Sequence, residues 1–180
     1  MWGGAGLILN GISTHIKERY GIRVNKFALD LSPGMLEIQK KINPDLKTAL
    51  NEDIRKTSLG NKEIDLTLMI DVLEHIPNSA EALEELKRIS KFVIFKVPLE
   101  DNLLDKTLNS ITRGKSRQQV IETVGHINVY NFKTLKYQIS EHTGQVLDSY
   151  FTNVFKYVLN SEHYRNIVLC KCFYTMIVII

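Results

Sequence analysis

Cysteine, proline and long apolar runs are all scarce in this chain of 180 residues. Its two cysteines, Cys170 and Cys172, would point from the same face of a strand, and we expect reduced thiols rather than a disulfide bridge. The apolar tail at 167–180 is interrupted by Lys171 and is short for a bilayer span. The sequence shows no signal peptide. These absences favour a cytoplasmic protein without a membrane span.

Charge of one sign is not concentrated anywhere either. The chain has 23 Lys and Arg against 20 Asp and Glu, and the basic residues are scattered, so we expect no nucleic-acid partner. Four prolines and 10 glycines leave no obvious linker, and no internal repeat is present. We therefore expect one domain over residues 1–180, long enough to bury a hydrophobic core.

Short apolar runs alternate with helical patterns between residues 24 and 97. The expected strands are Val24–Asp30, Leu46–Leu50, Asp65–Asp71 and Phe92–Val97. Two of the intervening helices follow good N-cap residues, Ser32 and Asn78. This alternation predicts an α/β fold with a Rossmann-like, doubly wound, mostly parallel sheet that all four strands share.

The pattern loosens after Pro98. Residues 100–125 are polar without a strong period, and we expect a long excursion there. A helix is expected between Asn131 and Gly144. The strand-like segments Val146–Val154 and Ile167–Ile180 predict an antiparallel edge at the C-terminus.

The stretch from Asp65 to Asn78 is the most informative part of the chain. Its apolar run is too short and too continuous for an amphipathic helix, which predicts a strand covered on both faces, with Leu68 and Ile70 buried. The run stops at Asp71. Ionisable side chains are thus expected just past the carboxyl end of the strand, which is the edge where open α/β sheets bind ligands.

A small glycine cluster, Gly3-Gly4-Ala5-Gly6, opens a helical pattern. Ile8, Ile12 and Ile16 repeat every four residues, and Gly21 can end the helix. Such a loop lets backbone N–H groups approach a ligand and directs the helix dipole at negative charge. Taken by itself, the same cluster also fits a flexible N-terminal tail.

Four motifs together carry a resemblance to a known family. They are ALDLSPGMLE at 28–37, EDI at 52–54, DLTLMIDVLEHIPN at 65–78 and GHINVYNFKTL at 125–135. In order and spacing they resemble the class I S-adenosylmethionine-dependent methyltransferases, specifically the methyltransferase type 11 group. The resemblance extends from Gly3 to Val154. It implies S-adenosylmethionine as cofactor and methyl transfer to an unidentified small-molecule acceptor.

The resemblance also implies roles for individual residues. The cofactor-binding residues would be Gly4, Gly6, Asp30, Leu31, Asp53, Ile54, Asp71 and Val72. Asp30 would accept both ribose hydroxyls, and Asp53 the adenine amine beside Ile54. Gly4 and Gly6 would bring backbone N–H groups to the methionine moiety.

The resemblance also places two residues, His126 and Tyr130, where the family's acceptor side closes. His75, His126 and Tyr130 are the catalytic candidates. His75 also fits a structural histidine, and the other two also fit packing or turn roles. The two cysteines have no His or Cys partner at metal-ligand spacing, so no metal site is predicted.

One departure from the family sets the alternatives. Members begin the domain with a strand that ends in an acid and Gly-x-Gly-x-Gly, whereas Trp2 stands here where the first glycine would fall, so the first strand is expected to be missing or truncated. The chain could be a fragment, a truncated paralogue without cofactor binding, or a chain in which another segment replaces the strand. The alternative function is a non-catalytic Rossmann-like interaction module, with a homodimer possible. A nucleotide binder is a third and weaker option, because the glycine cluster is incomplete.

Overall fold

A computed structural model describes residues 4–99, 110–115, 118, 122, 125–153 and 174–180. Its helices and strands in chain order are α1 (Leu7–Tyr20), β1 (Lys26–Leu29), α2 (Pro33–Ile42), β2 (Leu46–Leu50), β3 (Ile64–Ile70), the 3-10 turn η1 (Leu73–His75), α3 (Ser79–Ile89), β4 (Ser90–Leu99), α6 (Phe132–His142), β5 (Asp148–Asn153) and β6 (Tyr174–Ile179). The predicted α/β fold class is confirmed. No helix in the described parts of the chain is long and apolar enough to cross a membrane.

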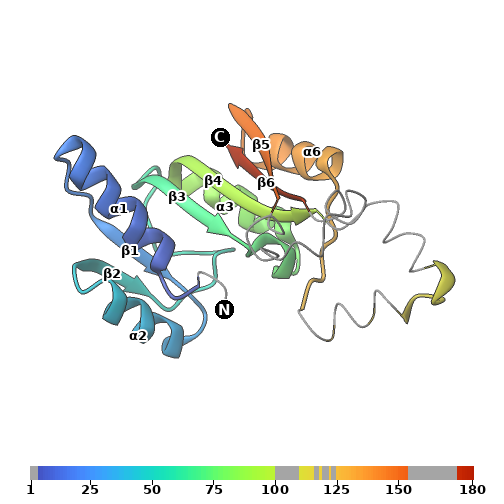
Figure 1. Ribbon diagram of the computed structural model, residues 1–180, viewed down its shortest axis with the longest axis horizontal. Helices are drawn as coiled ribbons and strands as arrows, with labels where there is room; N and C mark the ends of the chain where they lie inside the picture. The colour runs from blue at the N-terminus through green and yellow to red at the C-terminus, as the bar shows by residue number, and fades with distance from the viewer. Residues whose placement is uncertain (1–3, 100–109, 116–117, 119–121, 123–124, 154–173) are drawn as a thin grey trace, which may run out of the picture.

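The strands form two sheets. β1 and β2 pair in parallel, and the other sheet has the order β3-β4-β6-β5, in which β3 and β4 are parallel and the two contacts of β6 are antiparallel. In Figure 1, β1 and β2 lie with α1 and α2 at one end of the molecule, and the larger sheet lies beside them together with α3 and α6. The predicted antiparallel C-terminal edge is confirmed over the described residues, while residues 154 and 167–173 of its expected strands fall outside them.

The expectation that four strands share one sheet is wrong. Among the described strands, β1 and β2 pair only with each other, and no strand joins them to β3. The ladder of backbone hydrogen bonds is therefore interrupted between the two sheets. The parallel pairs themselves form as predicted, because each βαβ unit brings its strands together locally. The sequence pattern of the separate units carries no signal for the continuity of the ladder across the whole fold.

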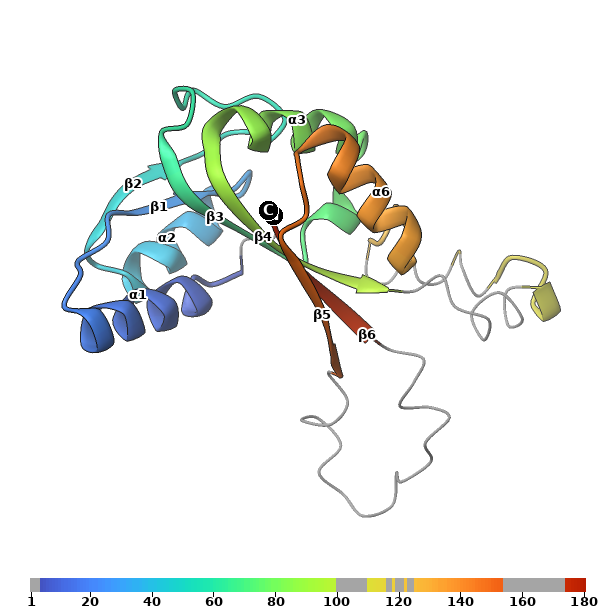
Figure 2. The ribbon, with the colours of Figure 1, turned by 90° about the horizontal axis from the view of Figure 1, so that it is seen from above.

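The main core lies on one face of the larger sheet. Phe95 and Val97 of β4 are fully buried there, and Met69 is Phe95's neighbour on β3. The helices α3 and α6 cover this face (Figure 2) and contribute side chains such as Leu86 and Leu135, which have no exposed surface. Burying each large aliphatic side chain contributes roughly 1.5–3 kcal/mol.

The opposite face of this sheet is less covered. Leu66 is 40% exposed and its β4 neighbour Phe92 is 51% exposed. Leu68 and Ile70 share this face, and they are half-buried rather than buried as predicted. The reason is that helices cover one face of β3 and β4, whereas the sequence argument assumed cover on both.

Helix boundaries follow the local chemistry closely. Ser32 caps α2 by accepting from the Met35 N–H at 3.4 Å, and Asn131 caps α6 in a reciprocal capping box with Thr134. Asn78 is the N-cap of α3, but its backbone is left-handed and its amide donates to Glu81 Oε1 at 2.6 Å instead of accepting from the helix. The positions of the N-caps were therefore predictable from the sequence, but the hydrogen bonding of Asn78 was not.

The helix α1 departs most from its predicted packing. Gly21 ends it in the left-handed conformation as expected. The isoleucine repeat does not form a buried face, since Ile8 is 50% exposed and Ile12 and Ile16 are half-buried. The helix α1 packs mainly against α2, which leaves that stripe without a full apolar partner.

Candidate cofactor and acceptor site

The glycine loop is held by polar side chains from α2 and its C-cap. Gly4 and Gly6 both have positive φ, +59° and +83°. Gln39 Nε2 donates to the Gly4 carbonyl at 2.8 Å, and Asn43 Nδ2 donates to the Gly6 carbonyl at 3.1 Å. Gly6 is the N-cap of α1, and none of the side chains that the structure describes caps that helix. Its first N–H groups therefore suit an anionic ligand group, helped by the helix dipole.

A buried polar network connects this loop to β1. Asn43 has no exposed surface and Lys26 is 5% exposed. Lys26 Nζ donates to Asn43 Oδ1 at 3.2 Å and pairs with Asp45 Oδ1 at 2.6 Å. The hydrogen bond from Lys26 holds the pKa of Asp45 below its usual range. Sequence reasoning missed this network, whose signals were a lysine inside a short strand and an Asn-Pro-Asp turn that begins 17 residues later.

Asp30 directly follows β1 and is 2% exposed. Its Oδ1 accepts the Ser32 N–H at 2.8 Å, and its carbonyl accepts Asn51 Nδ2 at 2.9 Å. The carboxylate is thus fixed at the joint carboxyl end of the two parallel strands, β1 and β2. Leu31 beside it is 59% exposed. Asn51 was not predicted, although it follows β2 as Asp30 follows β1.

Asp53 lies in the loop after β2 and holds a cation. Its carboxylate accepts from Arg55 Nε at 3.0 and 3.1 Å and from Arg55 Nη2 at 2.5 Å. This hydrogen bonding lowers the pKa of Asp53, so the group is ionised at neutral pH. Arg55 Nη1 also reaches the Pro77 carbonyl at 3.5 Å, which connects this loop to the segment after η1. Ile54 packs against the core cluster.

Asp71 directly follows β3 and has φ +51°, a left-handed conformation that is uncommon outside glycine. Its side chain is 45% exposed and forms an ion pair with Lys96 on the neighbouring strand β4. Val72 comes next, is the N-cap of η1 and packs against the core. The chain therefore turns sharply at the carboxyl end of β3, as the sequence predicted.

Two of the three catalytic candidates, His75 and His126, lie close to one another. His75 Nδ1 is 3.0 Å from the Gly125 carbonyl, and the His75 and His126 rings meet edge to face with centroids 4.7 Å apart. Tyr130 is 3% exposed and its hydroxyl donates to Ser79 Oγ at 3.2 Å. Burial raises the pKa of Tyr130.

Glu74 was not predicted as a site residue, yet it is the most buried acid near this cluster, at 1% exposed. Its Oε1 is 4.0 Å from His75 Nε2. The only sequence signal was its position between Asp71 and His75 in a turn that leaves a buried strand. Such a position favours solvent more often than burial, because a carboxylate is costly to desolvate.

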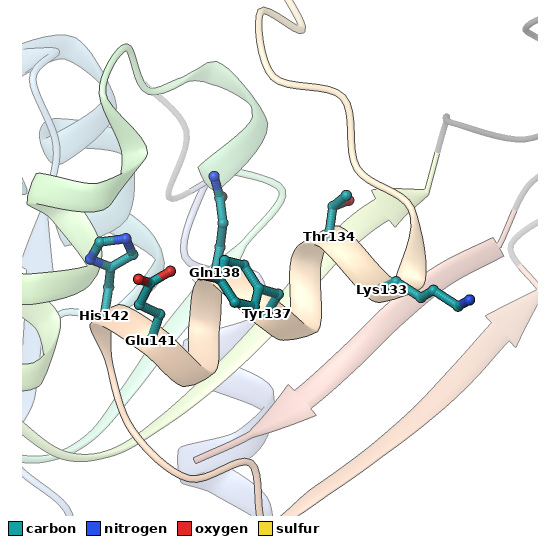
Figure 3. Close-up of a pocket in the computed structure, with 6 residues that line it drawn as sticks. All are labelled: Lys133, Thr134, Tyr137, Gln138, Glu141 and His142. Atoms are coloured by element: carbon teal, nitrogen blue, oxygen red, sulfur yellow. The ribbon is translucent and has the colours of Figure 1, made fainter.

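A shallow depression is also present along α6, lined by Lys133, Thr134, Tyr137, Gln138, Glu141 and His142. Figure 3 shows that all six side chains come from this one helix. His142 Nδ1 is 3.2 Å from Glu84 Oε1 of α3. A ligand site usually draws convergent polar groups from several elements, so this flank is not the candidate site.

One family model matches this chain. Residues 4–92 match the family model described as a methyltransferase domain. A search of curated proteins found no match.

Many solved structures share the fold at low sequence identity. A geranyl diphosphate methyltransferase in complex with S-adenosylmethionine aligns with a TM-score of 0.63 and 8% identity, covering 98% of this chain and 74% of that one. A structure from Galdieria sulphuraria, described as a sarcosine dimethylglycine methyltransferase, aligns with a TM-score of 0.67 and 12% identity. The alignment covers 98% of this chain and 75% of that one. The [4+2]-cyclase SpnF aligns with a TM-score of 0.65 and 9% identity, covering 98% of this chain and 71% of that one.

The family match contains the glycine loop and the ends of β1, β2 and β3, where the predicted cofactor residues lie. Residues 4–92 therefore belong to the methyltransferase domain family, that of the S-adenosylmethionine-dependent methyltransferases, and S-adenosylmethionine is the cofactor of that family.

Proposed function

We propose that this chain, acting as one domain, binds S-adenosylmethionine at the carboxyl ends of β1, β2 and β3 and transfers its methyl group to a small molecule. One observation carries this proposal. Asp30 and Asp71 each directly follow a parallel strand, and Asp53 comes three residues after another. Ligands of open α/β sheets bind at that edge.

The residues present fit the parts of such a cofactor. The Asp30 carboxylate has two oxygens, and after accepting the Ser32 N–H it has acceptor capacity for ribose hydroxyls. The N-terminus of α1, entered through Gly4 and Gly6, suits the amino-acid carboxylate. Asp53 would accept from the adenine amine while it holds Arg55, with Ile54 beside the ring. Leu31, Asp71 and Val72 would line the remainder of the site.

The bound cofactor supplies a methyl group on a sulfonium, which is already a strong electrophile. The chain's contribution is therefore to hold two reactants in line and exclude water, an effect worth several kcal/mol. A general base is needed only where the acceptor must lose a proton. Of the catalytic candidates, His75 and His126 carry imidazoles, the side chains that most often serve as general bases. Tyr130 instead supports packing, because it is buried and bonded to Ser79.

The test is calorimetric titration of S-adenosylmethionine into the wild-type chain and into Asp30→Ala. A charge-assisted hydrogen bond contributes roughly 1.5–3 kcal/mol, so the substitution should weaken binding by about 10- to 1000-fold. Asp30→Asn should be milder, since its amide oxygen can still accept the Ser32 N–H. Asp65→Ala is the matched control, because Asp65 lies near the start of β3 with its side chain 85% exposed. Equal binding by wild type and Asp30→Ala would refute the assignment.

The second candidate function is an interaction module without catalysis. It is favoured by the interrupted ladder between β1 and β3 and by the exposed apolar residues Leu66 and Phe92. The cyclase SpnF has a similar fold and is not described as a methyltransferase, so the fold alone does not fix the chemistry. A wild-type chain that binds no S-adenosylmethionine, yet sediments as a dimer, would favour this function.

A further inference from the structure

Two imidazoles and one buried carboxylate converge beyond the carboxyl end of β3. Glu74 and His75 come from η1, and His126 comes from a segment about fifty residues further along the chain. One nitrogen or oxygen donor of each residue lies within 4.8 Å of the donors of the other two. Donor atoms around one ion with bonds of roughly 2.1 Å are about 3.4 Å apart, so small rotations of these side chains would bring them into coordination.

The hydrogen bond to Gly125 determines the state of His75. A carbonyl oxygen can only accept, so Nδ1 of His75 carries the proton. In the neutral ring, Nε2 then presents its lone pair, and it lies 4.0 Å from the carboxylate oxygen of Glu74. A cation placed between these two buried, electron-rich atoms would be attracted by both. Backbone carbonyls commonly orient metal-binding histidines in this way.

The segment that contains His126 is fixed against η1. Its side chains alternate in exposure, which directs His126, Asn128 and Tyr130 inward. Asn128 Nδ2 donates to the carbonyls of Leu73 at 3.1 Å and Ile76 at 2.8 Å, and its N–H donates to the Glu74 carbonyl at 3.0 Å. The donors on the two segments are therefore held near one another by the backbone, before any ion binds.

We propose that Glu74, His75 and His126 bind one divalent transition-metal ion of the zinc class. Two imidazoles and a carboxylate suit Zn²⁺ and Co²⁺, and three protein ligands leave a position for water or an oxygen ligand. A single proton on His75 would also offset the charge of Glu74. That proton does not, however, explain why the imidazole of His126 lies beside the pair, whereas a metal ion would use this imidazole as a ligand.

The experiment is titration of Zn²⁺, and separately of Co²⁺, into the full chain after removal of metal with a chelator. The background variant is Cys170→Ser with Cys172→Ser, so that thiolates cannot bind the ion. One ion per chain should bind, and Co²⁺ should give the visible absorption of four-coordinate nitrogen and oxygen ligation. His126→Gln and His75→Gln should weaken binding by at least about 10- to 100-fold, the loss that outer-shell changes alone cause at metal sites.

Two controls keep the result interpretable. His142→Gln removes a histidine on α6 that pairs with Glu84, and it should bind the ion like the background chain. Glu74→Gln preserves the shape of a buried side chain, and circular dichroism confirms that each variant is folded. Failure to bind S-adenosylmethionine with intact metal binding would count against the proposed function alone.

The inference is overturned if the folded background chain binds neither ion, or if His126→Gln binds as tightly as His142→Gln. An NMR titration that finds His75 doubly protonated at neutral pH in the presence of excess Zn²⁺ would also overturn it, because a proton would then occupy the place of the metal.

Discussion

Replacement of Gly6 by alanine tests how the glycine loop is built. A Cβ at Gly6 would lie 2.7 Å from Asn43 Nδ2, closer than real contacts allow, and φ there is +83°. The left-handed backbone costs an L-residue roughly 1–2 kcal/mol. Displacing Asn43 also weakens its bond to the Gly6 carbonyl, which contributes about 0.5–1.5 kcal/mol. We therefore expect Gly6→Ala to lower the free energy of unfolding by about 1.5–3.5 kcal/mol.

Gly21→Ala is the matched control for this experiment. Gly21 is also left-handed, with φ +69°, but a Cβ there would meet nothing within 4 Å. Only the cost of the left-handed backbone remains, and the lower entropy of the unfolded chain partly offsets it. The free energy of unfolding should therefore fall by about 1 kcal/mol. Urea unfolding followed by circular dichroism measures both. Equal losses for the two variants would refute the claim that Asn43 and Gly6 are packed against each other.

Three further predictions concern the core, an ion pair and the segment over η1. Leu86→Ala should lower the free energy of unfolding by about 2–5 kcal/mol, because Leu86 is fully buried, whereas Leu66→Ala at an exposed position should change it by far less; similar losses would contradict the one-sided core. Hydrogen bonds from Arg88 and Thr57 lower the pKa of Glu85 from 4.5 to about 2, so its stabilisation is complete above pH 4.5 and is lost as the pH falls toward 2. Glu85→Gln should cost at most about 3 kcal/mol at neutral pH and approach wild type near pH 2, and a pH-independent loss would argue against the ion pair. Asn128→Ala removes two side-chain hydrogen bonds and should cost about 1–3 kcal/mol in chemical unfolding, with no measurable loss counting against the clamp on η1.

The fold class was predictable because its signals are local. The alternation of apolar runs and caps located β1 to β4, and residues such as Ser32 and Asn131 fixed the helix starts. The division into two sheets was not predictable in the same way. It depends on which strand edges meet across the molecule, and the same property left Leu68 and Ile70 half-buried.

The candidate site was likewise predictable from the sequence only in part. Asp30 and Asp71 were placed correctly at strand ends, because a strand end is visible in the sequence. The partners of the acids were not visible. Arg55 on Asp53 and Lys96 on Asp71 depend on side-chain geometry, and the burial of Glu74 depends on packing between segments far apart in the chain.

The most direct test of the central claim is a crystal structure of this chain with S-adenosylhomocysteine. We expect the ribose hydroxyls at the Asp30 carboxylate, the adenine beside Ile54 and the amino-acid carboxylate at the N-terminus of α1. A ligand bound away from the carboxyl ends of β1, β2 and β3, or crystals that remain free of ligand at saturating concentration, would contradict the account.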